Sequence, residues 1–398
     1  MAENAQNSTH GPLVGVTVLD LTLARAGPTC VRHLADWGAN VIRVQPPRSD
    51  GMMALRPDAD SENLHRNKRV ISLDLKSEAG HEAFLKLAKR ADVVVENMRT
   101  QVKYRLKIAY EDLQPINPRL VYGSISGFGQ TGPYSERAGV DQIAQGMGGL
   151  MSVTGAPGGG PMRAGIAISD MAAGTLLALA IMMALYERER TGQGRFVHTS
   201  LLESMIFMMD FQAARWLMEK DVPGQVGNEH PTQIPMGAFP TADGFMNLSA
   251  SSNAQFRRMC EALGHPEWAE KEAWKHGGGR SKDRATLHAA IADVTKTQPT
   301  AHWIAALEPH GLPCGPIYAM NEVFEDAQVR HLGMATPLSH PNPKYGDTHL
   351  VNSPLNFEGL DKSIRSAAKL TGVDTQDVLA ELGYSPSEID KMAADGVI

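Results

Sequence analysis

Short apolar runs alternate with amphipathic stretches along the first 130 residues of the chain. Five of the runs are typical of strands buried on both faces, because each is nearly continuous and rich in valine, isoleucine and leucine. They are VTVLDL, NVIRVQ, RVISLDL, DVVVEN and LVYGSIS, at residues 16–21, 40–45, 69–75, 92–97 and 120–126. A helix is predicted from Pro28 to Trp37, and residues 78–91 also have helical spacing. This alternation predicts an α/β fold with a Rossmann-like, doubly wound parallel sheet.

The rest of the chain has a different pattern. The glycine-rich stretch 135–168 predicts a loop over the sheet edge, and a helix then begins at Asp170. That helix carries the longest apolar run, Met171–Tyr186, which is short for a membrane span and so predicts a buried helix. Further expected elements are a helix at roughly 200–220, a hairpin turning at Asp243–Gly244, amphipathic helices over 253–310, a loop at GLPCGPIY and a short helix near 374–382.

The composition is that of an ordinary globular protein, with 398 residues, 42% apolar residues and a net charge of −6. This charge predicts neither nucleic acid nor a membrane as a partner. Cys30, Cys260 and Cys314 are widely spaced and odd in number, which argues against a disulfide framework or a metal site and favours a cytoplasmic location. The polar first 13 residues contain no apolar segment, so no secretory signal is expected.

Positive charge is concentrated in residues 66–107. Three of these residues, Arg99, Lys103 and Arg105, follow the fourth predicted strand, and ligands of such sheets bind beyond the carboxyl ends of the strands. Basic side chains there can hold phosphates. A nicotinamide cofactor is not predicted, because the first loop, LTLARAGP, lacks the G-x-G-x-x-G fingerprint and the second strand ends at Gln45 instead of an acid.

Asp170 stands between the glycine-rich stretch and the apolar helix. One interpretation is structural, with Asp170 or Ser169 capping that helix. The other is functional: the helix dipole would keep the carboxylate ionised, and it could attack a thioester to form a covalent acyl intermediate. The spacing alone leaves both interpretations open, and no Ser-His-Asp or metal-ligand spacing competes with Asp170.

Seven segments, taken in order, resemble the family III CoA-transferases, the group that includes formyl-CoA and carnitine CoA-transferases and shares its fold with the alpha-methylacyl-CoA racemases. They are VLDLTLARAGPTCVRHLADWGANVIRVQPP, HRNKRVISLDLKS, ADVVVENMR, SGFGQTGPY, SDMAAG with YERERTGQGR, GNEHPTQIPMGAFPTADG and GLPCGPIYAMNEVFEDAQVRHLGM. The resemblance covers nearly the whole chain. It implies a large domain built from both ends of the chain, an inserted smaller α+β domain, and two ring-like chains interlocked as a homodimer. The boundaries expected from it are a CoA-binding domain at 1–200, a linker helix at 201–225, a small domain at 226–315, and a linker with a C-terminal segment at 316–398.

The resemblance also implies roles for single residues. Asp170 would be the nucleophile, coenzyme A and its acyl thioesters would be substrates rather than permanently bound cofactors, and the second substrate would be a small carboxylic acid. Arg163 could pair with a second carboxylate of that acid or lie at the surface, and His230 and Gln233 could line the acceptor pocket. The residues expected to contact CoA are Ala24, Arg25, Ala26, Leu73, Asp74, Leu75, Lys76, Asn97, Met98, Arg99 and Arg105.

Three positions depart from the family's pattern. Gln45 stands where many members have an acid, which leaves the adenosine contacts around residues 43–46 open. The segment HPTQIPMG replaces the glycine run of the formyl-CoA transferases. Gly139, Val140 and Asp141 replace the Gly-His-Asp of the racemases, and the missing histidine favours a transferase. The alternatives that remain are a 2-methylacyl-CoA racemase-type isomerase and a non-catalytic CoA-binding protein.

Overall fold

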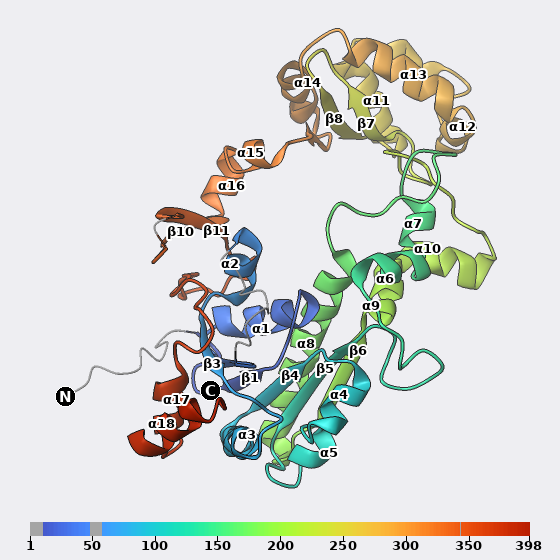
Figure 1. Ribbon diagram of the computed structural model, residues 1–398. Helices are drawn as coiled ribbons and strands as arrows, with labels where there is room; N and C mark the ends of the chain where they lie inside the picture. The colour runs from blue at the N-terminus through green and yellow to red at the C-terminus, as the bar shows by residue number, and fades with distance from the viewer. Residues whose placement is uncertain (1–10, 48–57, 343) are drawn as a thin grey trace. The chain divides into compact units, whose positions relative to one another are not determined.

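The computed structural model describes residues 11–47, 58–342 and 344–398, which divide into two compact units (Figure 1). The first unit comprises residues up to 150, 163–220 and 330–398, and the second comprises 151–162 and 221–329. Residues 1–10, where no secretory signal is expected, lie outside the described residues. The four-part division expected from the family resemblance stays a prediction.

A six-stranded parallel sheet forms the centre of the first unit, in the order β3-β2-β1-β4-β5-β6. Its strands are β1 (Thr17–Asp20), β2 (Asn40–Gln45), β3 (Lys68–Ser72), β4 (Val93–Glu96), β5 (Val121–Ser126) and β6 (Phe196–Ser200). The predicted α/β class and the five predicted strands are confirmed. The strand order reverses between β1 and β4, so the carboxyl ends of these two strands form the crevice in which such sheets bind ligands.

Helices cover both faces of this sheet (Figure 1). One face carries α1 (Ala26–Asp36) and α8 (Ile168–Thr191). The other carries α3 (Glu78–Arg90), α5 (Tyr110–Leu113), α17 (Thr375–Glu381) and α18 (Pro386–Ala394). The C-terminal helices therefore complete a core that is built mainly from the first 125 residues.

Helix α8 confirms the prediction of a buried helix. By length and composition alone it could cross a membrane, but Leu177 and Ile181 are fully buried against the sheet. Its packing against α1 is so close that a Cβ atom at Gly174 would lie 2.5 Å from the carbonyl oxygen of Ala26. Only glycine permits this approach, which places the beginnings of α8 and α1 side by side.

The second unit contains an antiparallel sheet of β7 (Met236–Pro240), β8 (Phe245–Ser249) and β9 (Cys314–Pro316). The hairpin predicted at Asp243–Gly244 joins β7 to β8 and is confirmed. The prediction of a plain loop at GLPCGPIY is wrong in part, because this segment contributes β9. The predicted helices are confirmed as α11 (Asn253–Ala262), α12 (Gly277–Lys282), α13 (Arg284–Thr295) and α14 (Thr300–Leu307).

The described residues also contain shorter elements. In the first unit these are α2 (Ala59–His65), α4 (Thr100–Arg105), α6 (Asp141–Met147), α9 (Leu201–Met208), α10 (Asp210–Ala214), a π-helix at Arg215–Glu219, β10 (Ala335–Ser339) and β11 (Asp347–Val351). Helix α7 (Leu150–Val153) lies at the boundary of the units, as does α16 (Ala327–His331), and α15 (Met320–Val323) belongs to the second unit. The prediction of a loop over 135–168 is wrong where α6 and α7 form.

Candidate active site

The loops that follow β1 and β4 meet at the switch point of the sheet. The side chain of Asn97 accepts a hydrogen bond from the backbone N–H of Leu23 at 2.8 Å and donates one to the Leu23 carbonyl oxygen at 2.7 Å. Ala24 has a φ of 57°, in the left-handed region, and the chain then enters α1 at Ala26. The fold therefore brings together two of the segments predicted to contact CoA.

A buried ion pair holds the beginning of the first loop. Both carboxylate oxygens of Asp20 are engaged: one accepts hydrogen bonds from the backbone N–H and hydroxyl of Thr22, and the other lies 2.9 Å from Lys68 Nζ. Burial alone would raise the pKa of Asp20, but the charges of Lys68 and Arg43 outweigh it and lower the pKa to about 2. Asp20 is thus a fixed anion that shapes the loop leading to Ala24.

Asp170 is the third residue of α8, and the residue that caps the helix is Ala167. The interpretation of Asp170 or Ser169 as the cap is therefore wrong. The Asp170 carboxylate accepts no hydrogen bond from a described residue. Burial raises the pKa of Asp170, and the negative charge of Asp141 raises it further. The positive charge of Arg25 lowers it, and the resulting pKa is about 6. The expectation that the helix dipole fixes the charge is too simple, although Asp170 is still ionised at neutral pH.

Asp141 is a residue whose importance the sequence did not indicate. It begins α6, is 8% exposed, and accepts hydrogen bonds from the backbone N–H and the hydroxyl of Ser169 at 2.9 and 2.8 Å. Its other oxygen accepts from Gln145 Nε2, and Gln145 Oε1 accepts from the backbone N–H of Ala164. Asp141 thereby fixes the first turn of α8 and adds a negative charge beside Asp170. The sequence signals at this position are the i, i+4 spacing of Asp141 and Gln145 and the match of Asp141 to the aspartate of the Gly-His-Asp motif, and neither indicates a contact with Ser169.

Arg163 lies beside Asp141. Its guanidinium is 3.9 Å from Asp141 Oδ2, and half of its side chain is exposed. A half-exposed cation so close to Asp141 has room to pair with an incoming anion. The fold therefore associates Arg163, Asp141, Asp170 and Arg25, of which all except Asp141 were predicted from the sequence.

The basic residues after β4 separate into two kinds. Arg99 and Arg105, at the two ends of α4, are exposed and form no ion pair with a described residue. Lys103 is 2% exposed and lies 2.9 Å from Glu96, so the prediction that it could hold phosphates is wrong.

In the segment after β3, which is also predicted to contact CoA, Leu73 is buried and Lys76 is exposed. The backbone N–H of Asp74 donates a hydrogen bond to the carbonyl oxygen of Val397. In the segment after β4, the backbone N–H of Met98 donates one to the Glu96 carboxylate.

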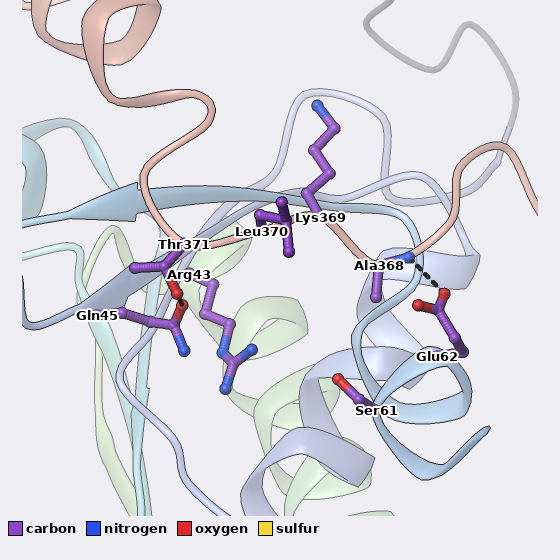
Figure 2. A pocket seen from close by; sticks show the side chains of 8 residues that line it. All are labelled: Arg43, Gln45, Ser61, Glu62, Ala368, Lys369, Leu370 and Thr371. Atoms are coloured by element: carbon purple, nitrogen blue, oxygen red, sulfur yellow. Dashed lines mark hydrogen bonds between the residues drawn. The ribbon is translucent and has the colours of Figure 1, made fainter. Parts of the chain in front are cut away.

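A polar pocket lies at the carboxyl end of β2 (Figure 2). Gln45 accepts a hydrogen bond from the Thr371 hydroxyl at 2.7 Å, and Glu62 accepts one from the backbone N–H of Ala368 at 2.9 Å. The guanidinium of Arg43 points into the pocket, and its buried Nε finds no hydrogen-bond partner in the described part of the chain. The remaining lining residues are Ser61, Lys369 and Leu370. The amide oxygen of Gln45 is therefore already bonded to Thr371 of the C-terminal segment. Many family members have an acid at this position.

His230 and Gln233 belong to the second unit. The Nδ1 atom of His230 accepts hydrogen bonds from the backbone N–H groups of Thr232 and Gln233, so this segment forms a tight turn. Their part in an acceptor pocket stays a prediction. Among the residues described here, no group of three or more His, Cys, Asp or Glu side chains could hold a metal ion.

Comparison with known proteins identifies the family. Residues 13–375 match the family model described as CoA-transferase family III. The chain is 35% identical to succinyl-CoA:glutarate CoA-transferase of Mus musculus, over 97% of this chain and 90% of that protein. It is 33% identical to acetyl-CoA:oxalate CoA-transferase of Acetobacter aceti, over 91% and 93% of the two chains. A crystal structure of a CAIB/BAIF family protein from Brucella suis, 33% identical, superposes with a TM-score of 0.82 over 94% of this chain and all of that one. The chain belongs to the family III CoA-transferases and is a CoA-transferase that uses acyl-CoA and carboxylic acids.

Proposed function

We propose that this enzyme moves CoA from an acyl-CoA donor to a small dicarboxylic acid through a covalent aspartyl-CoA thioester on Asp170. The observation that carries the proposal is the carboxylate of Asp170, which is half-buried, accepts no hydrogen bond from a described residue and has a pKa raised by burial to about 6. A desolvated carboxylate that is still ionised at neutral pH is a competent nucleophile.

The reaction begins when an Asp170 oxygen attacks the thioester carbonyl. The C–S bond breaks, giving a mixed anhydride and CoA thiolate, and the thiolate then attacks the aspartyl carbonyl. The donor acid leaves and an aspartyl-CoA thioester remains. The acceptor carboxylate repeats the two steps in reverse, so the thioester bond is conserved and neither ATP, a metal nor a permanently bound cofactor is needed. Backbone N–H groups of the glycine-rich segments would stabilise each oxyanion.

The same proposal places CoA along the carboxyl edge of the sheet. The loop of Ala24, Arg25 and Ala26, the segment Leu73–Lys76 and the segment Asn97–Arg99 all lie at this edge. Arg99 and Arg105 would bind phosphates, because both are exposed and without an ion-pair partner among the described residues. Arg25 would lie between the CoA site and Asp170. A cytoplasmic location belongs to this proposal, since it rests on the three unpaired cysteines alone.

A dicarboxylic acceptor is the chemistry that Arg163 fits best. One carboxylate of the acceptor must reach Asp170, and Arg163 can pair with the second because it is half exposed next to Asp141. Relatives are named for transfer to glutarate, oxalate and mesaconate, which all carry two carboxylates.

A panel of acyl-CoA donors against mono- and dicarboxylic acids, read by mass spectrometry, tests the activity. Dicarboxylates should be the better acceptors, and Arg163→Gln should raise their KM about tenfold or more while leaving the KM of monocarboxylates nearly unchanged. Equal losses for both classes would contradict the role of Arg163. Deuterium uptake from heavy water into a 2-methylacyl-CoA without any acceptor would indicate an isomerase instead.

The pH dependence of transfer should report the ionisation of Asp170. Since only the ionised carboxylate attacks, kcat/KM should fall as the pH drops through about 6. Asp141→Asn removes the neighbouring negative charge, so the midpoint should move to lower pH. Steady-state kinetics of both proteins between pH 4.5 and 8 would measure the two midpoints. An unchanged midpoint in Asp141→Asn would show that the two carboxylates do not interact.

The proposal includes an interlocked homodimer. Helices α9 and α10 and the π-helix at Arg215–Glu219 expose seven large apolar side chains within 13 residues of the chain: Ile206, Phe207, Met208, Phe211, Trp216, Leu217 and Met218. Exposed apolar surface of this extent marks an association site. The double variant Phe207→Glu with Met218→Glu should be monomeric by light scattering, whereas Val373→Glu, a similarly exposed position on another segment, should remain dimeric. A wild-type monomer would overturn this part of the proposal.

A further inference from the structure

Lys103 is the basic residue at the ligand edge that CoA binding leaves unexplained. Its ammonium group has three acceptors: Glu96 at 2.9 Å, Ser124 Oγ at 3.3 Å and Gln130 Oε1 at 2.7 Å. The side chains of Lys103 and Glu96 are 2% and 0% exposed. The Glu96 carboxylate also accepts from the Ser124 hydroxyl, and Gln130 Nε2 donates to Ser124 Oγ at 2.9 Å. The four side chains therefore form a closed network in which the Lys103 ammonium has three acceptors.

This network joins three segments that are separate in the sequence. Glu96 ends β4 and holds the backbone N–H of Met98 at 2.7 Å, Lys103 belongs to α4, and Gln130 belongs to the glycine-rich segment 127–132 after β5. Asn97, the next residue after Glu96, bonds the loop after β1. The network thus lies under the edge along which the proposed CoA site extends.

A gain in folding stability does not explain why Lys103 and Glu96 are buried as an ion pair. Desolvating both charges costs about as much as their attraction returns, so such a pair adds little over apolar side chains of the same size. The pair instead fixes the local geometry, because a buried charge is stable only where its hydrogen-bond partners are well placed.

The glycine-rich segment needs such an external restraint. Gly129 and Gly132 have φ values of 108° and 93°, which other residues rarely adopt, and glycine carries no side chain that could pack. A Cβ atom at Gly127 would lie 2.7 Å from the Cα atom of Gly139, two residues before Asp141. The first residue of segment 127–132 is therefore packed against Gly139, which leaves the rest of the segment to be held by Gln130.

We infer that the Glu96–Lys103–Gln130 network is a positioning device that holds segments 97–99 and 127–132 in the geometry that binds acyl-CoA. Lys103 is a positioning residue here, since it is enclosed by protein and acts through Gln130 and Glu96. The inference rests on the proposed CoA site and adds residues that the site itself does not include.

Two variants release the segment without leaving an unpaired buried charge. Gln130→Leu removes one acceptor while Lys103 keeps Glu96 and Ser124. Glu96→Gln combined with Lys103→Met removes both charges together. In each, the KM for acyl-CoA should rise about tenfold, since a hydrogen bond to a charged group is lost, while the KM of the acid acceptor stays unchanged. Combining all three substitutions should raise the KM no further than the larger of the two effects. Gln376→Leu, an exposed glutamine in α17, is the matched control.

Hydrogen exchange of the ligand-free protein gives a second readout. Backbone amides in 127–132 should exchange faster in both variants, with the melting temperature and the exchange of the central strands unchanged. If the wild-type protein binds no CoA, the proposed function fails, but this exchange experiment still tests the network. Unchanged exchange and unchanged acyl-CoA KM would overturn the inference, and so would a fall in melting temperature without any selective effect on KM.

Discussion

Asp170→Ala is expected to abolish CoA transfer, with kcat at least about a thousandfold below that of the wild type. The carboxylate oxygen is the atom that forms the covalent intermediate in the proposed mechanism, and alanine offers no replacement. Asp141 cannot substitute for it, because both of its oxygens already accept hydrogen bonds from Ser169 and Gln145. Initial rates with the best donor and acceptor from the substrate panel would measure the loss.

The variant should remain folded, which separates a catalytic loss from a structural one. The pKa of Asp170 is raised in the folded protein, from 3.8 to about 6. Its ionisation therefore lowers the free energy of unfolding as the pH rises from 3.8 to about 6, and the whole of this loss is present at higher pH. At neutral pH, Asp170→Ala should accordingly be no less stable than the wild type. Asp377→Ala, an exposed acid in the first turn of α17, should retain full activity. Transfer by Asp170→Ala at more than a tenth of the wild-type rate would rule out this nucleophile.

Lys68→Met is expected to cause the largest loss of stability, about 3–5 kcal/mol in the free energy of unfolding. Lys68 and Asp20 are both fully buried and lie 2.9 Å apart, so removing the ammonium group leaves the buried carboxylate without its ion-pair partner. Burial lowers the pKa of Lys68, which Asp20 opposes, so the charge on each residue depends on the other. Urea denaturation followed by circular dichroism would measure the change.

Two variants give this prediction its controls. Lys86→Met breaks an exposed ion pair with Glu82 and should cost less than about 1 kcal/mol. The double variant Lys68→Met with Asp20→Asn should recover part of the loss, because the unpaired charge is removed and the loop at Thr22 keeps an acceptor. A loss below about 1 kcal/mol in Lys68→Met would mean that the ion pair does not secure the first loop.

The sequence was sufficient for the elements whose patterns are strong. The strands of the first 126 residues are apolar on both faces, and α3 shows helical spacing with Ser77 capping its first turn. Strand β6 was missed because it is only partly buried at the sheet edge, and its FVHTS sequence follows directly on a polar segment. Strand β9 was missed because its Cys-Gly-Pro sequence resembles a turn, and it pairs with β8 only through tertiary contacts.

The candidate site was predictable only in part. Asp170, Arg25 and Arg163 stood out by position and by family resemblance. The fold brings the charges of Arg25 and Asp141 close to Asp170, and it places Arg163 beside Asp141. The role of Asp141 was not predicted, because it depends on hydrogen bonds from Ser169, 28 residues away, and no local sequence pattern reveals such a contact. Lys103 was misassigned for the complementary reason: its place in the chain resembles that of Arg99 and Arg105, and only burial distinguishes a structural cation from a binding one.

Mass spectrometry can detect the aspartyl-CoA thioester on Asp170 itself, which is the defining intermediate of the proposed mechanism. The enzyme would be incubated with donor acyl-CoA alone, quenched in acid and digested with trypsin, which cleaves after Arg163 and Arg188 and leaves Asp170 and Glu187 as the acids of one peptide. A CoA adduct is expected on Asp170, and it should disappear when acceptor is added and be absent from Asp170→Ala. Efficient transfer with no adduct, or with an adduct on another residue, would contradict this mechanism.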